Sequence, residues 1–273
     1  MWLNNDRVFY AGLLGQVSQR TMGGWVIYVS LGAPLHLAIG KAAGSDAAAG
    51  PWVSADVAVL PPWTPHRVVC AQRLICCLTI EPETVDDAAL PGWLLQRCGV
   101  RPADDDAAQA LLQRVRRAHA HLRDLGSGLA LDTGGFDELC FGHPLAPRRI
   151  DPRIARVLEG MRNDPAAPLT AQQGAAAADL SISRFLHLLK AEAGSSFRSL
   201  RTWKRARSLL HHVTRVTHLV NVALDTGYPD STHFSHSIRQ VYGLKPRDLF
   251  AGSRRLTVLG DSPAARAALS ADR

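Results

Sequence analysis

The sequence has few cysteines and no long apolar run, and each absence excludes a class of protein. Five cysteines in 273 residues are too few and too scattered for a disulfide framework, since none forms a CxxC pair and Cys76 directly precedes Cys77. No stretch reaches the ~18 uninterrupted apolar residues of a membrane-spanning helix. Because no secretory signal is recognised at the N-terminus, we expect a cytoplasmic protein with no membrane partner.

The short motifs of common enzymes are also missing. The sequence shows no nucleophile elbow, phosphate-binding glycine loop, HExxH or paired-carboxylate constellation. Residues 104–106, three aspartates, are predicted to begin a helix rather than to bind a metal. Cys70, Cys76 and Cys77 lie in apolar strand-like runs, which favours buried thiols over oxidant sensors. We therefore predict neither an enzyme nor a bound cofactor or metal.

The charge of the chain is unevenly placed. Residues 1–147 contain 11 Lys and Arg against 14 Asp and Glu, a net charge of −3, whereas residues 148–273 contain 20 against 10, a net charge of +10. A basic half joined to a slightly acidic one indicates a nucleic-acid-binding domain fused to a second domain. The alternative is an ordinary solvated basic surface.

The first ~80 residues have the pattern of β structure. Short apolar runs rich in β-branched residues are separated by Gly, Pro and Asp, as in a barrel or sandwich. The predicted strands cover residues 25–31, 35–40, 56–60, 67–70 and 74–80.

Residues 104–125 change to a helical pattern with an apolar stripe. We expect the stripe to pack on its own domain, with dimerisation as the alternative. Its members are Ala108, Leu111, Leu112, Val115, Ala118, His119 and Leu122.

The chain therefore divides into two domains of an α+β protein. The predicted parts are a sensing or dimerisation domain at residues 1–125, a Gly-rich linker at 126–147, a helical DNA-binding domain at 148–252 and a frayed tail at 253–273.

The helical domain contains two similar units. In the first, Thr170 caps a short Ala-rich helix, and Ser181 or Ser183 caps a second helix that ends at Gly194. The small residues Ala176–Ala177 are predicted to let the two helices approach closely.

The second unit, residues 216–250, repeats this plan. Thr217 caps its first helix, Gly227–Tyr228 make the turn, and Asp230 or Ser231 caps its second helix. The inward positions of the first helix are predicted to be Leu219, Val220, Ala223 and Leu224. Between the units, residues 196–212 are long enough for one connecting helix of roughly 25 Å.

Residues 150–250 as a whole resemble the DNA-binding domain of the AraC/XylS family of bacterial regulators. The resemblance rests on the runs LSISRFLHLLKAEAGSSF, ARSLL and DTGYPDSTHFSHSIRQVYGLKPRDLF. The positions of the last run that fit the family pattern are Gly227, Tyr228, Asp230, Ser231 or Thr232, Phe234, Arg239, Gly243, Pro246 and Phe250.

The resemblance implies that residues 183–193 and 231–242 form helices that enter successive major grooves. The implied base-edge contacts are Ser183, Leu186, His187, Ser231, Thr232 and His236. The implied phosphate contacts are Arg184, Lys190, Arg198, Arg239 and Lys245.

Two positions depart from the family. His187 and His236 stand where Arg is common, and His cannot grip guanine with two hydrogen bonds as Arg does. We therefore expect modest affinity, or DNA binding that strengthens as the histidines become protonated at lower pH. Equal binding at pH 6 and pH 8 would contradict the second expectation, and each His is equally well interpreted as a polar residue facing the groove.

The N-terminal half resembles the cupin-like effector domains of the same family, through the run PPWTPHRV. A cupin metal site needs His-x-His, a Glu and a later His, and His36 and His66 have no such partners. If the barrel is present, aromatic and His side chains could line a pocket for a small molecule, although each is more often core. These candidates are Trp25, Tyr28, His36, Trp52, Trp63 and His66.

Together these features predict a sequence-specific transcription regulator that binds promoter DNA. An unidentified small-molecule effector, RNA polymerase and a second copy of the chain are the other expected partners, and activation is the expected mode. The alternatives are an enzymatic cupin with a helical appendage, which would need a metal triad, and a nonspecific architectural DNA binder.

Overall fold

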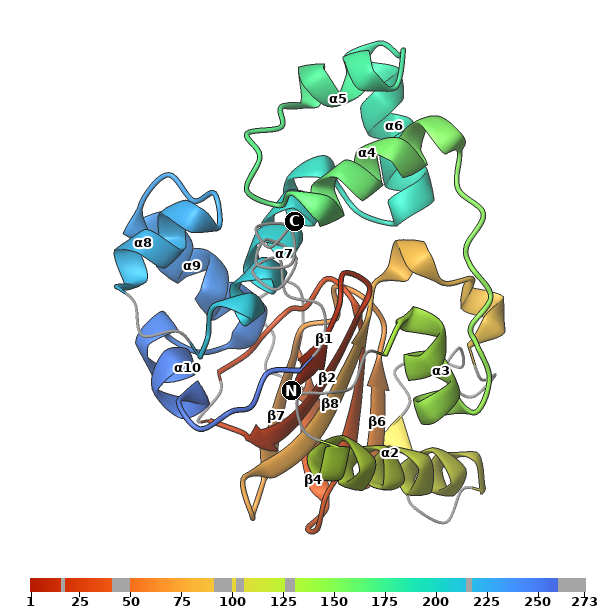
Figure 1. Cartoon of the computed structure of the whole chain (residues 1–273), viewed down its shortest axis with the longest axis vertical. Coiled ribbons are helices and arrows are strands. Elements are labelled where there is room, and N and C mark those ends of the chain that lie inside the picture. Colours follow the sequence, from red (N-terminus) through yellow and green to blue (C-terminus); the bar gives the residue numbers. More distant parts are fainter. Residues whose placement is uncertain are drawn as a thin grey trace, which may run out of the picture.

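The computed structural model describes residues 1–15, 18–40, 50–90, 100–101, 106–125, 131–214 and 218–259. An N-terminal β-sheet domain is followed by a helical C-terminal domain (Figure 1). The predicted division of the chain into a β-rich half and a helical half is therefore confirmed.

The N-terminal domain contains two antiparallel sheets. The larger has the order β1 (Trp2–Leu3), β2 (Arg7–Leu13), β8 (Leu74–Ile80), β3 (Trp25–Ser30), β6 (Val57–Leu60) and β9 (Val100–Arg101). The smaller has the order β5 (Val53–Ala55), β4 (Leu35–Ile39) and β7 (His66–Cys70). Within the described residues neither sheet closes on itself, so the predicted cupin-like barrel is not confirmed.

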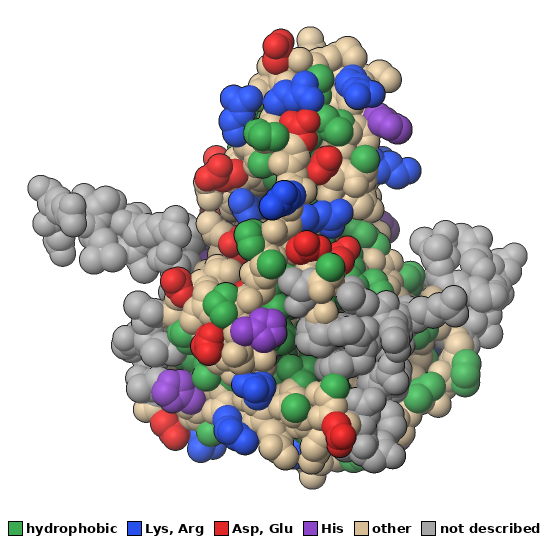
Figure 2. Space-filling model, turned by 90° about the vertical axis from the view of Figure 1, so that its right-hand side faces the viewer, with side chains coloured by type: hydrophobic (Ala, Val, Ile, Leu, Met, Phe, Trp, Pro, Cys, Tyr) green, Lys and Arg blue, Asp and Glu red, His purple; other side chains and the backbone are tan. Residues whose placement is uncertain are grey.

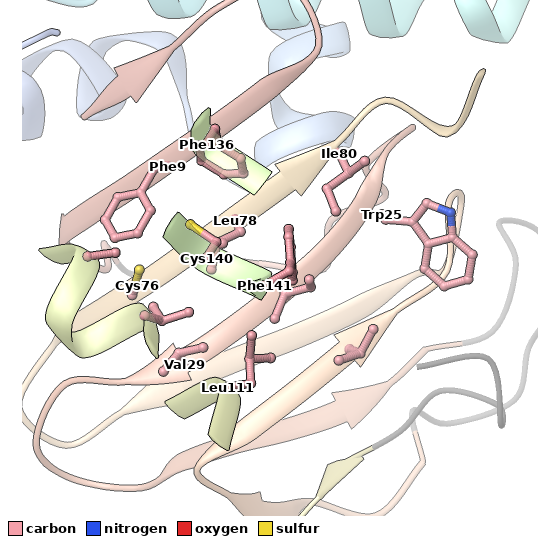
Figure 3. Close-up of a cluster of buried hydrophobic side chains, with 14 of the residues drawn as sticks. Phe9, Trp25, Val29, Cys76, Leu78, Ile80, Leu111, Phe136, Cys140 and Phe141 are labelled. Atoms are coloured by element: carbon pink, nitrogen blue, oxygen red, sulfur yellow. The ribbon is translucent and has the colours of Figure 1, made fainter. Parts of the chain in front are cut away.

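One face of the larger sheet is covered by α2 (Asp106–Leu125) and α3 (Thr133–Phe141). Figure 3 shows Phe136, Cys140 and Phe141 of α3 lying over the sheet. All members of the predicted α2 stripe except the half-buried His119 are buried in this core. The stripe packs on its own domain, so dimerisation through it, the alternative left open by the sequence, is wrong.

The predicted linker contains a helix that its composition concealed. Asp132 accepts a hydrogen bond from the backbone N–H of Gly135 at 2.7 Å and caps α3, and Gly142 ends the helix at φ +85°. Phe136 is fully buried against Trp2, with ring centroids 4.9 Å apart. Gly134, Gly135 and Gly142, interpreted as loop residues, lie at the ends of a helix whose apolar side chains fill the core.

The C-terminal domain is built from α4 (Pro152–Asn163), α5 (Ala171–Ala177), α6 (Ile182–Ala193), α7 (Phe197–Ser208), α8 (Leu219–Asp225), α9 (Ser231–Tyr242) and α10 (Pro246–Ser253). The connecting α-helix α7 is shorter than expected, because a 3₁₀ turn, η4 (Leu209–His211), replaces its last part. Two further 3₁₀ turns, η1 (Pro82–Thr84) and η2 (Asp87–Ala89), follow β8.

The two helical units have different cores. The first unit buries its apolar side chains among α4, α5, α6 and the start of α7. The second unit and the remainder of α7 share one continuous core with the other face of the sheet domain. The second unit is thus packed on the N-terminal domain, while the first extends away from the sheets (Figure 1).

The chain returns to its own start after α10. The N–H of Leu3 donates to the carbonyl of Leu259 at 3.1 Å, and the N–H of Leu259 donates to the carbonyl of Met1 at 2.7 Å. Residues 253–259 are therefore not frayed as predicted, and the rest of the predicted tail, residues 260–273, lies outside the described residues. No helix in the described part of the chain has the length and apolar character needed to cross a membrane.

Candidate nucleic-acid interface and interdomain pocket

The first helix-turn-helix unit begins and ends at the predicted residues. Thr170 and Gln173 form a reciprocal capping box at the start of α5. The Ser181 hydroxyl accepts a hydrogen bond from the N–H of Arg184 at the start of α6, and Gly194 ends that helix at φ +70°. A local hydrogen bond thus fixes the start of α6, and the left-handed conformation of Gly194 ends it.

The residues that allow α5 to approach α6 differ from those predicted. Ala176 and Ala177 are exposed, whereas Gly174 and Ala175 are buried. A Cβ at Gly174 would lie 2.7 Å from Cζ of Phe185. The prediction failed because small residues occur all along this helix, so composition alone does not show which of them faces α6.

The second unit confirms the predicted turn and the predicted ends of α9. Gly227 has φ +79°, and Gly243 ends α9 at φ +68°. Asp230 Oδ1 accepts hydrogen bonds from the N–H groups of Thr232 and His233, both at 2.8 Å. Thr217, the residue expected to cap α8, lies outside the described residues, but the N-cap position of α8 is occupied by His218, whose side chain makes no capping hydrogen bond. The predicted cap of α8 is therefore not confirmed.

The inward face of α8 was partly mispredicted. Val222 and Ala223 are buried, but Val220 and Leu224 are each 57% exposed. Because α8 is only two turns long, a shift of one residue in the assumed register is enough to exchange its buried and exposed positions.

All of the predicted DNA contacts are exposed. Ser183, Leu186 and His187 lie on α6 with Arg184 and Lys190, and Figure 2 shows basic side chains spread over the lobe of α4, α5 and α6, interspersed with acidic ones. The remaining candidates are Arg198 on α7, Ser231, Thr232, His236 and Arg239 on α9, and Lys245 at the start of α10.

A buried charge cluster joins the connecting helix to the sheet domain. Glu81, which follows β8, is fully buried and accepts a hydrogen bond from Trp203 Nε1 at 3.0 Å. Lys204 contacts the carboxylates of both Glu81 and Glu83. Arg207 Nε lies 2.8 Å from Glu81 Oε1. Burial alone would raise the pKa of Glu83, but the Lys204 ammonium holds that pKa below its usual value.

A cavity of about 450 Å³ lies between the sheet domain and the second helix-turn-helix unit. Its lining is mostly apolar. From the sheet domain it includes Val8, Tyr10, Leu14, Met22, Tyr28 and Ile75, and from the C-terminal domain Leu210, Val213, Tyr242, Leu244, Leu249 and Leu256.

The cavity is lined by a buried cation with two unpartnered nitrogen atoms. Arg20 lines it and is 8% exposed, and its Nε and Nη2 atoms make no hydrogen bond with any described residue. Its guanidinium carbon lies 5.1 Å from the centroid of the Tyr28 ring. Arg73 and Asp248 also line the cavity. A buried donor without an acceptor costs about 1–3 kcal/mol, so an anionic group entering here would be stabilised.

Comparison with known proteins agrees with this geometry. Residues 175–252 match the family model described as a helix-turn-helix domain. These residues form a helix-turn-helix domain of the AraC type. Invasion protein InvF of Salmonella typhi is 34% identical over 71 residues, which cover 26% of this chain and 33% of InvF. The chain thus spans about a third of the length of the curated relatives that it matches.

The fold of the whole chain is similar to that of ToxT from Vibrio cholerae. One ToxT structure, from strain O395, has a TM-score of 0.56 at 9% identity and covers 92% of this chain and 99% of ToxT. Another, of ToxT bound to (E)-4-(8-methylnaphthalen-1-yl)but-3-enoic acid, has a TM-score of 0.51 at 9% identity and covers 90% of this chain and 98% of ToxT. The sheet domain and the AraC-type domain therefore occur together in a known fold.

Only one of the effector contacts predicted from the sequence, Tyr28, lines the cavity beside the AraC-type domain. Trp25 is buried in the core of the opposite sheet face. His36 and Trp52 are exposed on the smaller sheet and beside it, and Trp63 is half-buried.

His66 is buried and bonded within the sheet domain. Its Nδ1 lies 2.8 Å from the Thr64 carbonyl, which can only accept, so Nδ1 carries the proton and Nε2 accepts from the Tyr28 hydroxyl at 2.8 Å. Burial, with a smaller effect of Arg20, lowers the pKa of His66 to about 3.

The thiols lie as the sequence predicted. Cys70 and Cys76 are buried and Cys77 is half-buried. Burial raises the pKa of Cys77 to about 11, which disfavours the reactive thiolate.

Proposed function

We propose that the protein is a sequence-specific DNA-binding transcription regulator in which α6 and α9 enter successive major grooves. The observation that carries this proposal is the pair of capped second helices in the AraC-type domain, each with its predicted base-edge residues exposed. The basic charge of residues 148–273 suits phosphate contacts on both sides of the grooves.

Selection from a random pool of duplexes with the full-length chain tests this proposal. The expected result is a site with two half-sites about one helical turn apart. His187→Ala should relax the sequence preference in one half-site, and His236→Ala in the other. A nonspecific architectural binder would instead retain DNA without enriching any sequence, and that result would contradict the proposal.

We further propose that the interdomain cavity binds the effector, and that the effector is an apolar molecule with one anionic group. Its volume is in the usual range for small-molecule sites, about 300–1,000 Å³. The apolar lining suits the body of such a molecule, and the unpartnered donors of Arg20 suit a carboxylate. That ToxT, a protein of similar fold, binds a carboxylic acid with an aromatic body is consistent with this proposal.

Two probes with the same apolar chain, one anionic and one neutral, separate the contribution of the anionic group from that of the apolar body. Decanoate should raise the melting temperature of the full-length chain more than decanol does, and Arg20→Gln should remove that difference. Arg123→Gln changes an Arg on the surface of α2 that is 70% exposed and should leave the difference intact. Equal responses to decanoate and decanol in the unmodified protein would contradict an anionic effector.

Activation is the mode that we propose for the promoter-bound protein, through contact with RNA polymerase. Run-off transcription from a weak promoter with the selected site upstream tests this, and more transcript is expected when the protein is added. A decrease in transcript would indicate repression instead.

Among the described residues no group of three His, Cys, Asp or Glu could hold a metal ion, so the enzymatic-cupin alternative gains no support.

A further inference from the structure

The two second helices of the AraC-type domain expose different chemistry. On α6, Ile182 is 46% and Leu186 is 37% exposed. These residues are four positions apart and therefore share one face of the helix. On α9 every large apolar side chain is buried. The first unit thus offers an apolar stripe where the second offers hydroxyl and imidazole groups.

We infer that Ile182 and Leu186 read the methyl groups of thymines in the major groove. The inference rests on the proposed DNA-binding function and specifies how the first unit achieves sequence preference. The C5-methyl of thymine is the apolar group that base pairs present in the major groove, and apolar side chains recognise it by contact. Ile182 is the first residue of α6, and the N-terminal residues of such helices are those that reach base edges.

The surroundings of this stripe favour DNA over a protein partner. Arg184 and Lys190 are exposed on the same helix, and Ser183 and His187 directly adjoin the two apolar residues. Lys190 continues the apolar stripe four residues after Leu186, whereas Arg184 lies on a different side of the helix. DNA presents both phosphates and thymine methyl groups, so it matches a helix that exposes cations together with an apolar stripe. An apolar protein surface would leave those cations without partners.

Replacement of thymine by deoxyuridine in the selected site tests the inference, because it removes only the methyl group. We expect binding by the full-length chain to weaken roughly three- to tenfold at one or more positions within a single half-site. The double variant Ile182→Ala, Leu186→Ala should bind the thymine and uracil versions equally.

The control variant is Val220→Ala, Leu224→Ala, which removes an equally spaced exposed apolar pair from α8. It should keep the full thymine preference. Circular dichroism should show both double variants folded, because all four side chains are exposed.

Three outcomes are distinguishable. Loss of the methyl dependence in the α6 variant alone supports the inference. A selected site that is bound equally well with uracil at every position overturns it and leaves the proposed function standing, with a protein partner as the remaining role for the stripe. Failure to select any site overturns the proposed function and this inference together.

Discussion

At the scale of single residues, the most consequential feature is a carboxylate buried between the domains. Glu81 belongs to the sheet domain, and its partners Trp203, Lys204 and Arg207 all lie on the connecting helix of the AraC-type domain. Removing one member of a buried ion pair leaves an uncompensated charge, which costs more than the pair itself contributes.

We predict that Glu81→Gln lowers the free energy of unfolding by about 3 kcal/mol. The amide keeps the size of the side chain but no longer neutralises Arg207, while Lys204 retains Glu83. Urea denaturation of the full-length chain measures the change. Glu159→Gln, an exposed position on α4, should change stability by less than about 0.5 kcal/mol. Equal effects of the two substitutions would show that the cluster does not stabilise the folded chain.

His66 makes stability depend on pH. Its pKa in the folded protein is lowered to about 3, against about 6.5 when unfolded, so the unfolded chain binds a proton first as the pH falls. The neutral His66 therefore contributes stability that is fully present above pH 6.5 and is lost below it, at up to about 1.4 kcal/mol per pH unit.

Unfolding free energies measured from pH 7.5 to pH 5 test this. The unmodified protein should lose stability across that interval, and His66→Gln, which cannot titrate, should lose less. If the two pH profiles are parallel, His66 is not the group responsible.

At the scale of elements, the features predicted correctly from the sequence are those that depend on residues close together in the chain. The caps of α6 and α9 were predictable because Ser181, Asp230 and the two glycines act within a few residues of their own helix. Helix α3 and the faces of α5 and α8 were not, because tertiary packing decides which side of a short helix is buried. Strands β1, β2, β5 and β9 were not predicted either, because pairing with strands distant in the sequence, such as that of β2 with β8, stabilises them.

Two glycines on neighbouring helices should respond to alanine in opposite directions. At Gly174 the new Cβ would collide with Phe185, so Gly174→Ala should destabilise the first unit by about 1–3 kcal/mol. At Gly160, on α4, the new Cβ meets nothing within 4 Å, so Gly160→Ala should stabilise it by about 0.5–1 kcal/mol. Thermal unfolding measures both, and stabilisation by Gly174→Ala would mean that α5 and α6 are not in close contact.

At the scale of the whole molecule, the two helix-turn-helix units differ in how they are held. The second shares its core with the sheet domain and forms one wall of the cavity, whereas the first has a core of its own. A ligand in the cavity would therefore act first on the position of α9 and α10. A ligand that contacts one position of these helices better than another changes the affinity of the protein for DNA.

The sequence named candidate DNA contacts, all of which are exposed, and missed the cavity. The predicted DNA contacts lie within two continuous segments and carry a family motif. The cavity is assembled from residues as distant as Arg20 and Leu256, and no pattern within one segment connects them. Arg20 lies in the polar run SQRT, residues 18–21, where nothing distinguishes it from a surface residue until its unpartnered donors are seen.

The most direct test of the account is competition between the selected site and a shuffled duplex of equal length for the full-length chain, at several salt concentrations. We predict at least ~10³-fold preference for the selected site, and we expect the affinity for both duplexes to fall steeply as the salt concentration rises. Equal affinity for the two duplexes at every salt concentration would contradict sequence-specific regulation.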